Sequence, residues 1–213
     1  MPTCQLKNRE NRLCLQWQQL EICVDFLSPK QVYRQRQLRR EMLTKAIGIK
    51  AGKSLKVIDA TAGLGNDAFI IASLGCSVIL LERSDVVIKL LEDGLSRASK
   101  DKCIADIVNR MTLIQTDSIA YLRQIKDDDK PDVVYLDPMF PQRSKSALVK
   151  KEMQVLQSLL GHDNDADDLL LSAMNCATQR VVLKRPRLAK SLTSLQPSFI
   201  LSGRSSRFDV YVK

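Results

Sequence analysis

A glycine-rich turn between an apolar run and a helical pattern is the feature that most limits how this chain can fold. The run Val57–Ala60 has the length of a buried strand and contains Asp59, and the turn after it holds Gly63 and Gly65. A helical pattern starts directly after the turn, at Asp67. Glycine accepts a positive φ and has no Cβ, so a bound group can approach this backbone closely. The segment therefore predicts a strand–turn–helix unit that binds a ligand at the carboxyl end of the strand.

Strand-like and helix-like segments alternate along the chain from Leu55 onward. Apolar runs of strand length lie at 56–60, 77–82, 111–115, 133–137 and 180–184. Segments of helical length lie at 67–74, 85–99, 118–125, 151–160 and 166–178. This alternation predicts an α/β protein with a Rossmann-like, mostly parallel twisted sheet covered by helices. Residues 198–202 and 208–212 are expected to add a C-terminal antiparallel hairpin.

The first 48 residues follow a different pattern and are expected to form a small appendage to the main domain, residues 49–213. Apolar and polar residues alternate between residues 12 and 27, which predicts a short β-hairpin or two edge strands. Ser28–Gln31 has the form of a capping box with Pro29 at the first helical position. We expect one basic helix from there to Ile47, with Gly48 as its stop.

Basic residues outnumber acidic ones and are unevenly placed. The chain has 33 Lys and Arg against 24 Asp and Glu, which gives a net charge of +9. The excess gathers in 30–45 and in 184–213. Basic stretches attract polyanions, and phosphate contacts make such binding depend steeply on salt. Charge alone does not favour nucleic acid over an ordinary solvated surface.

The residues that usually support metal or histidine chemistry are scarce. His162 is the one histidine, and the six cysteines contain no C-x-x-C pair. We therefore expect no metal site, no histidine-based triad, and cysteines that stay reduced and mostly packed. No apolar run approaches the roughly 18 residues of a membrane span, and residues 1–7 lack the apolar core of a secretory signal. The sequence favours a cytoplasmic protein.

Three predicted strands end in or near a carboxylate: Asp59, Glu82 and Asp137. The carboxyl ends of neighbouring parallel strands meet at one edge of a sheet. Gly63–Ala68 also fits the dinucleotide pattern G-x-G-x-x-[GA], with Glu82 placed to bind a ribose. Two features favour S-adenosylmethionine (SAM) over NAD. Asp59 lies four residues before Gly63, where a carboxylate can hold the amino group of a methionine moiety. The segment Asp137-Pro138-Met139-Phe140 resembles the D/N-P-P-Y/F motif of amino-methyltransferases.

The polar residues of this edge have expected roles. Glu82 is expected to accept hydrogen bonds from both ribose hydroxyls, and Asp117, with Ser118 beside it, from the adenine amino group. Asp137 is the expected catalytic residue. Its carboxylate and the backbone carbonyl beside it, at the Asp137-Pro138 step, would accept the N–H bonds of an exocyclic base amine. Phe140 is expected to stack on a flipped base.

Basic residues are expected to flank the same edge and to contact RNA. They lie after Phe140 and at the end of the strand 180–184, and they are Arg143, Lys145, Lys150, Lys151, Lys184, Arg185 and Arg187. Positive charge beside a base-methylation motif favours nucleic acid as the substrate.

Several motifs in order give the chain a specific resemblance to one family. They are D-A-T-A-G-L-G-x-D-A-F at 59–69, L-L-E-R at 80–83, V-V-Y-L-D-P-M-F-P at 133–141, K-S-A-L-V-K-K-E-M at 145–153, V-V-L-K-R-P at 181–186, and Gly203 with Arg207-Phe208-Asp209. Over about residues 45–213 the chain resembles the bacterial small-subunit ribosomal RNA guanine-N2 methyltransferases of the J type. The resemblance implies SAM-dependent N2-methylation of one guanosine in small-subunit (16S) ribosomal RNA. The cofactor contacts that it implies are Asn66, Asp67, Glu82, Arg83, Asp117, Ser118 and Asp137.

Two other functions stay open on the sequence. A catalytically silent RNA-binding or ribosome-assembly protein of the same fold would bind RNA without transferring a methyl group. An NAD-dependent oxidoreductase would bind nicotinamide in place of SAM, although no His or Tyr proton donor is evident. On the leading interpretation the partner is ribosomal RNA or the small ribosomal subunit.

Overall fold

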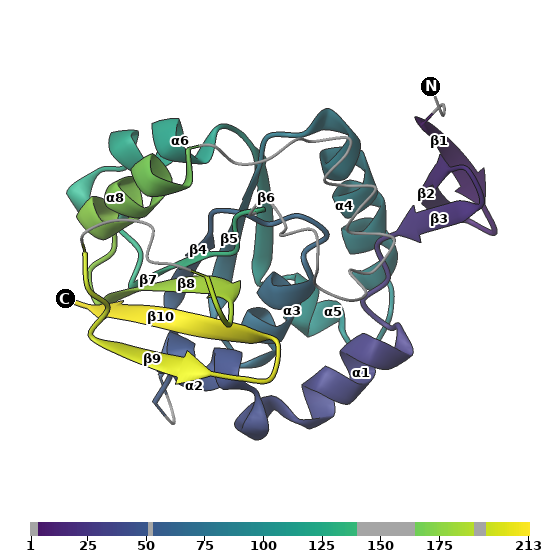
Figure 1. Ribbon diagram of the computed structural model, residues 1–213. Helices are drawn as coiled ribbons and strands as arrows, with labels where there is room; N and C mark the ends of the chain where they lie inside the picture. Colours follow the sequence, from purple (N-terminus) through teal and green to yellow (C-terminus); the bar gives the residue numbers. More distant parts are fainter. Residues whose placement is uncertain (1–3, 51–52, 140–164, 190–194) are drawn as a thin grey trace.

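The computed structural model describes residues 4–50, 53–139, 165–189 and 195–213 and centres on one mixed sheet (Figure 1). Among these residues seven strands pair in the order β6-β5-β4-β7-β8-β10-β9. Their bounds are β4 (Lys56–Asp59), β5 (Ser77–Glu82), β6 (Met111–Gln115), β7 (Val133–Leu136), β8 (Arg180–Pro186), β9 (Phe199–Ser202) and β10 (Ser206–Val212). The five strands β6, β5, β4, β7 and β8 run parallel to one another, whereas β10 is antiparallel to β8 and β9. The predicted parallel sheet and C-terminal antiparallel hairpin are confirmed.

Helices cover both faces of the sheet because successive strand residues point to opposite sides. Val57 and Val133 belong to one buried cluster with α2, α3, α4 and α5, whereas Ile58 and Val134 belong to a second with α6 and α8. The bounds are α2 (Met42–Ile47), α3 (Asn66–Ser73), α4 (Asp85–Ala98), α5 (Ala105–Val108), α6 (Ser118–Gln124), α8 (Ala166–Cys176) and a 3-10 turn, η2 (Asp127–Asp129). The short α5 was not predicted, because four residues carry no helical periodicity. No helix in the described ranges is long and apolar enough to cross a membrane.

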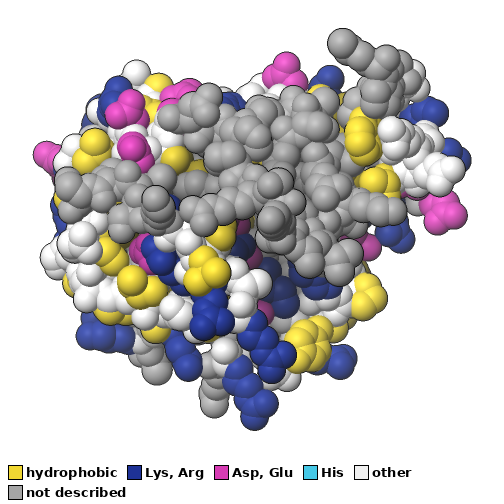
Figure 2. Space-filling model, in the orientation of Figure 1, with side chains coloured by type: hydrophobic (Ala, Val, Ile, Leu, Met, Phe, Trp, Pro, Cys, Tyr) yellow, Lys and Arg dark blue, Asp and Glu magenta, His cyan; other side chains and the backbone are white. Residues whose placement is uncertain are grey.

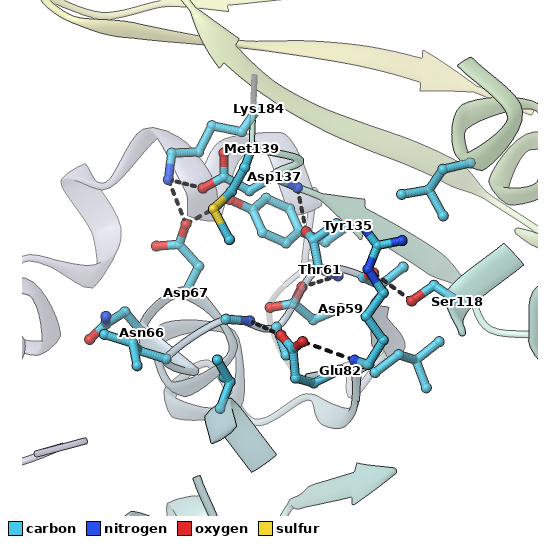
Figure 3. Close-up of a pocket in the computed structure, with 18 of the residues that line it drawn as sticks. Asp59, Thr61, Asn66, Asp67, Glu82, Ser118, Tyr135, Asp137, Met139 and Lys184 are labelled. Atoms are coloured by element: carbon cyan, nitrogen blue, oxygen red, sulfur yellow. Dashed lines mark hydrogen bonds and ion pairs between the residues drawn. The ribbon is translucent and has the colours of Figure 1, made fainter. Parts of the chain in front are cut away.

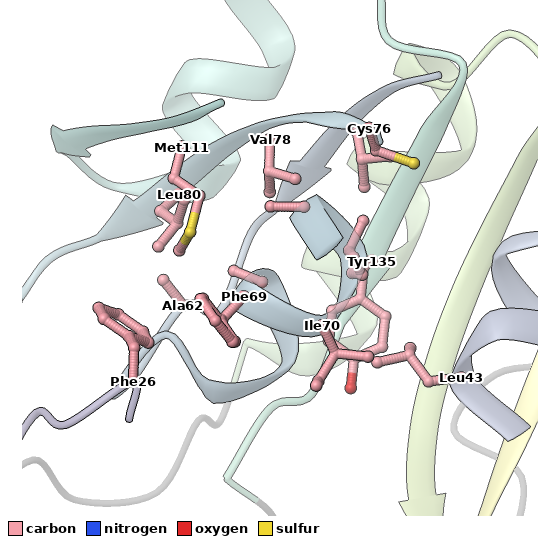
Figure 4. Close-up of a cluster of buried hydrophobic side chains, with 14 of the residues drawn as sticks. Phe26, Leu43, Ala62, Phe69, Ile70, Cys76, Val78, Leu80, Met111 and Tyr135 are labelled. Atoms are coloured by element: carbon pink, nitrogen blue, oxygen red, sulfur yellow. The ribbon is translucent and has the colours of Figure 1, made fainter. Parts of the chain in front are cut away.

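The front segment forms its own antiparallel sheet and then enters the main core. Its strands are β1 (Cys4–Arg9), β2 (Arg12–Trp17) and β3 (Leu20–Cys23), in that order. The predicted hairpin is confirmed as β2–β3, with Gln18 at a φ of +56°, whereas β1 was missed. After β3, Phe26 stacks on the fully buried Phe69 with 5.1 Å between ring centroids (Figure 4).

Two cysteines correct the expectation of reduced thiols. Cys14 on β2 and Cys23 on β3 form a disulfide, and their Cα atoms are 4.5 Å apart. The two residues lie directly opposite each other in the β2–β3 register. Cys76, Cys103 and Cys176 are free, and Cys76 and Cys176 are buried as expected. A cross-strand pair nine residues apart has no C-x-x-C signature, so the sequence did not indicate this disulfide.

The prediction of a single basic helix up to Ile47 is wrong, because the segment is divided into two helices and a 3-10 turn. Helix α1 (Pro29–Arg36) is followed by a 3-10 turn, η1 (Leu38–Arg40), and only then by α2. Glu41 between them is extended, with a φ of −63° and a ψ of 129°. Pro29 starts the helix and Gly48 ends α2 with a φ of +72°, both as predicted. The capping box does not form, since the Gln31 amide instead donates to the Asn66 carbonyl at 3.0 Å.

Candidate functional site

The carboxyl ends of β4, β5 and β7 open into a cavity of about 750 Å³. Most of the residues that the sequence assigned to this edge line it (Figure 3). They are Asp59, Gly63, Asn66, Asp67, Glu82, Arg83, Asp117, Ser118, Asp137 and Lys184. Residues far apart in the sequence therefore meet at one edge, as the parallel topology requires.

The glycine turn has the backbone geometry that the sequence predicted. Gly63 has a φ of +51° and Gly65 a φ of +71°, both in the left-handed region. Only Gly63 lines the cavity. A Cβ at Gly65 would lie 2.9 Å from Leu91 and 3.3 Å from Phe26, so this glycine serves packing of the turn against the core.

Glu82 is held in a fixed position at the end of β5. Its carboxylate accepts hydrogen bonds from the backbone N–H of Gly63 at 3.1 Å, of Arg83 at 2.9 Å and of Ser84 at 2.8 Å. Burial raises the pKa of this carboxyl, and the three N–H groups oppose the rise because they stabilise the charged form. The result is an acceptor pre-oriented beside the glycine turn.

Asp117 and Ser118 lie at the start of α6 and carry structural contacts. The Asp117 carboxylate accepts from the Ala120 N–H at 2.9 Å and so caps the helix. The Ser118 hydroxyl donates to the Ala60 carbonyl at 2.7 Å, which ties α6 to the end of β4. Both residues also line the cavity.

Asp59 is a buried acid without an ion pair in the described part of the chain. Asp59 is 1% exposed, and its carboxylate accepts a hydrogen bond from the Thr61 N–H at 3.1 Å. Burial raises its pKa to about 8, although the Thr61 hydrogen bond opposes the shift. A cationic ligand group in the cavity would compensate this carboxylate.

The pKa of Asp59 predicts how stability depends on pH. Between about pH 4 and 8 the folded form keeps a proton that the unfolded chain releases, so the free energy of unfolding falls as pH rises. The contribution of Asp59 to that slope is at most about 1.4 kcal/mol per pH unit. Asp59→Asn removes it, which urea denaturation of both proteins across this range measures. Equal slopes for the two proteins would contradict the assignment.

Lys184 connects two carboxylates at the mouth of the cavity (Figure 3). Its Nζ lies 2.8 Å from Asp67 Oδ2 and 2.6 Å from Asp137 Oδ2. Asp67 also accepts from the Tyr135 hydroxyl at 2.7 Å and pairs with Arg34 at 2.8 Å. These five side chains come from α1, α3, the end of β7 and β8.

The charges of this cluster shift one another. Burial alone would raise the pKa of Asp67, but Lys184 and Arg34 hold it well below its usual value. Burial raises the pKa of Asp137, Lys184 opposes the rise and Asp67 adds to it. Burial would lower the pKa of Lys184, yet the two carboxylates raise it. Lys184 is therefore a fixed cation between the acids.

Sequence reasoning missed two residues of this cluster, Tyr135 and Arg34, and also Thr61 beside it. Tyr135 stands two positions before Asp137, so strand alternation could have placed both on one side of β7. Thr61 accepts from the Asp137 backbone N–H at 2.6 Å, and its place after Asp59 was the available signal. Arg34 had no signal, because its contact with Asp67 depends on where α1 packs.

The structure corrects one of the expected RNA contacts, that of Arg185. Lys184 lies at the cavity and pairs with its two acids, and its RNA contact stays a prediction. Arg185 is 4% exposed and its guanidinium lies 3.7 Å from Asp209, so it is not available to an RNA at the surface. Arg187 is exposed, and its RNA contact stays a prediction. Residues outside the described ranges are Phe140, Arg143, Lys145, Lys150 and Lys151. Pro138 follows Asp137 directly but does not line the cavity.

A sheet whose parallel strands end in acids around one cavity, followed by antiparallel β10 and β9, is the Rossmann-like arrangement of the SAM-dependent methyltransferases. The family model described as "Putative SAM-dependent methyltransferase" matches residues 2–213, so the methyl donor is SAM. Among curated proteins, the Ribosomal RNA small subunit methyltransferase J of Shewanella amazonensis is 52% identical over 90% of this chain and 78% of that protein. The protein of the same name from Nitrosococcus oceani is 47% identical over 99% of this chain and 85% of that protein.

A solved structure agrees with these relatives. The SAM-dependent methyltransferase from Neisseria gonorrhoeae is 34% identical, with a TM-score of 0.79 over 99% of this chain and 83% of that one. The chain belongs to the family of Ribosomal RNA small subunit methyltransferase J. The resemblance and the fold class predicted from the sequence are confirmed.

Proposed function

We propose that this protein transfers the methyl group of SAM to the exocyclic N2 of one guanosine in small-subunit ribosomal RNA. The observation that carries the proposal is the position of Asp137, at the end of β7 and on the wall of the cavity that also contains Asp59 and Glu82. The names of the relatives support RNA of the small ribosomal subunit as the substrate. Such a substrate is found in the cytoplasm, and we propose that location for this protein.

We assign residues of the cavity to the ribose, the ammonium group and the adenine of SAM. Glu82 is the proposed acceptor for the ribose hydroxyls, since three backbone N–H groups already orient it. Asp59 is the proposed partner of the ammonium group, because it is a buried acid with no ion pair in the described ranges. Asp117 and Ser118 are proposed to bound the adenine, and Asn66, Asp67 and Arg83 to line the remaining wall.

Asp137 is proposed to prepare the amine for attack. SAM supplies an electrophilic methyl group on a sulfonium. An exocyclic base amine is a poor nucleophile, because its lone pair is delocalised into the ring. The Asp137 carboxylate and the backbone carbonyl at Asp137-Pro138 accept the amine N–H bonds and favour the pyramidal nitrogen. Thr61 holds the Asp137 backbone and Lys184 its carboxylate, so this acceptor needs little reorganisation.

Methyl transfer with radiolabelled SAM tests the proposal. The purified protein is incubated with deproteinised small-subunit RNA and, separately, with intact small subunits, and the labelled nucleotide is mapped. We expect label in N2-methylguanosine at one position. RNA binding without transfer to either substrate would instead support a silent binding protein and overturn the proposal.

Replacement of Glu82 tests the cofactor site. In Glu82→Gln an amide nitrogen replaces one carboxylate oxygen and cannot accept from a backbone N–H or a ribose hydroxyl. A charge-assisted hydrogen bond contributes roughly 1.5–3 kcal/mol, so we expect the Kd for SAM to rise at least about ten-fold by calorimetry. Glu92→Gln, at an exposed position of α4, is the matched control. An unchanged Kd in Glu82→Gln would place the ribose elsewhere.

A further inference from the structure

Helix α1 has two faces with different surroundings. On its inner face, Gln31 is fully buried and donates to the Asn66 carbonyl at 3.0 Å, and Arg34 pairs with Asp67 at 2.8 Å. Arg34 also pairs with Glu41 at 3.0 Å. The inner face is therefore fixed to the first turn of α3, the turn that also lines the cavity.

The outer face of α1 is exposed, basic and aromatic. Tyr33 is 67% exposed, and Arg36 and Arg40 are exposed beside it in sequence. Arg36, Gln37, Leu38 and Arg40 line a shallow hollow. Helix α1 has no acidic residue, and within the described ranges no ion pair engages Arg36 or Arg40. We call Tyr33, Arg36, Gln37, Leu38 and Arg40 the α1 surface.

The α1 surface is continuous with the mouth of the cavity. Lys30 and Arg34 of α1 and Met42 of α2 are among the cavity lining. Across the mouth, Arg187 and Arg204 are exposed, and the Arg187 N–H donates to the Ser205 carbonyl, whose residue also lines the cavity. Figure 2 shows Lys and Arg side chains gathered on this face around α1 and the β9–β10 turn. A polyanion that crosses the mouth of the cavity would contact both the α1 surface and the arginines Arg187 and Arg204.

We infer that the α1 surface binds the RNA segment next to the target guanosine, an inference that rests on the proposed function. Arg36 and Arg40 contact backbone phosphates, and Tyr33 stacks on an unpaired base. Arginine charge with an interleaved exposed aromatic ring is the composition that suits single-stranded RNA. A base can enter the cavity only when it leaves its stack, so a firm hold on the neighbouring nucleotides favours that state. Because Gln31 and Arg34 tie α1 to the first turn of α3, which lines the cavity, the RNA is held in register with the methyl donor.

The phosphate contacts are tested by the salt dependence of RNA binding. The probe is deproteinised small-subunit RNA, and the variant carries both Arg36→Ala and Arg40→Ala. Removal of one phosphate contact lowers the slope of log Kd against log salt by about one, so we expect a decrease of about two and roughly ten-fold weaker binding. The control is Lys100→Ala with Lys102→Ala, an equal loss of exposed charge after α4. That loop lies at the opposite edge of the sheet, because α4 starts at the carboxyl end of β5 and runs back.

The stacking contact is tested by a pair of substitutions at Tyr33. Stacking of a base on an aromatic ring predicts about five- to hundred-fold weaker binding in Tyr33→Ala and near-normal binding in Tyr33→Phe, which keeps the ring. The exposed position of Tyr33 leaves the core intact, and unchanged SAM affinity confirms folding. Equal affinities and slopes for the wild type and all α1-surface variants would overturn the inference. If the wild type binds RNA but transfers no methyl group, the proposed function fails, and the same binding measurements still decide the α1 surface.

Discussion

Asp137→Ala is expected to lower kcat by at least about 10²–10³-fold, the usual cost of removing one pre-oriented group that stabilises a transition state. SAM should still bind measurably, because the proposed ribose and ammonium partners, Glu82 and Asp59, are untouched. The fold should also survive, since Lys184 keeps Asp67 as a partner at 2.8 Å. Single-turnover methyl transfer and SAM calorimetry measure the two quantities separately.

Two comparison variants sharpen this prediction. Asp137→Asn keeps one oxygen acceptor and the side-chain shape, so its kcat should lie between those of the wild type and Asp137→Ala. Asp128→Ala removes an exposed acid of η2 and should leave kcat unchanged. Near-normal turnover in Asp137→Ala would remove Asp137 from the mechanism, whereas loss of SAM binding in that variant would assign it to the cofactor.

Asp67→Ala is expected to lower the free energy of unfolding by about 3 kcal/mol, because removing one partner of a buried ion pair leaves the other charge uncompensated. The Asp67 side chain is 14% exposed and contacts Lys184, Arg34 and Tyr135. The cost stays near the lower end of the usual range because Lys184 still has Asp137 and Arg34 still has Glu41. Urea denaturation at neutral pH measures the change.

The pH dependence of this stabilisation has a defined sign. The pKa of folded Asp67 is lowered, so its contribution is fully present above the unfolded pKa near 3.8 and is lost as pH falls below it. The difference between the wild type and Asp67→Ala should therefore shrink at strongly acidic pH. A double-mutant cycle with Lys184→Met should give a coupling free energy of about 1 kcal/mol or more. Additive effects of the two substitutions would contradict the pairing.

The strands and their terminal acids were predictable because their signals are local. An apolar run followed by turn glycines marks β4 and the turn at Gly63, and the same reasoning located Glu82 and Asp137. The parallel topology then brings the three carboxylates to one edge without further information. The bounds of helix α1 were harder to predict. Its start at Pro29 and the end of α2 at Gly48 have local signals, but the interruption between the two helices does not.

The errors share one physical origin, which is contact between residues distant in the chain. The end of the strand 180–184 correctly placed Lys184 beside the cavity, but the sequence did not show that it pairs with Asp67, 117 residues away. Arg185 was expected at an RNA-binding rim and is instead buried beside Asp209. Cys14 and Cys23 pair because β2 and β3 align in one register.

Periodicity, turn glycines and ordered motifs were sufficient to establish the α/β fold, the acidic strand ends and the family of this protein. Those features follow from backbone sterics and hydrophobic burial, which act over a few residues at a time. The pairing of the charged side chains at the cavity was decided only when α1, α3, β7 and β8 packed together. Four contacts illustrate this: Asp67 with Lys184, Arg34 and Tyr135, and Asp137 with Lys184. Burial strengthens such pairs by excluding water, and burial is a property of the assembled structure rather than of any segment.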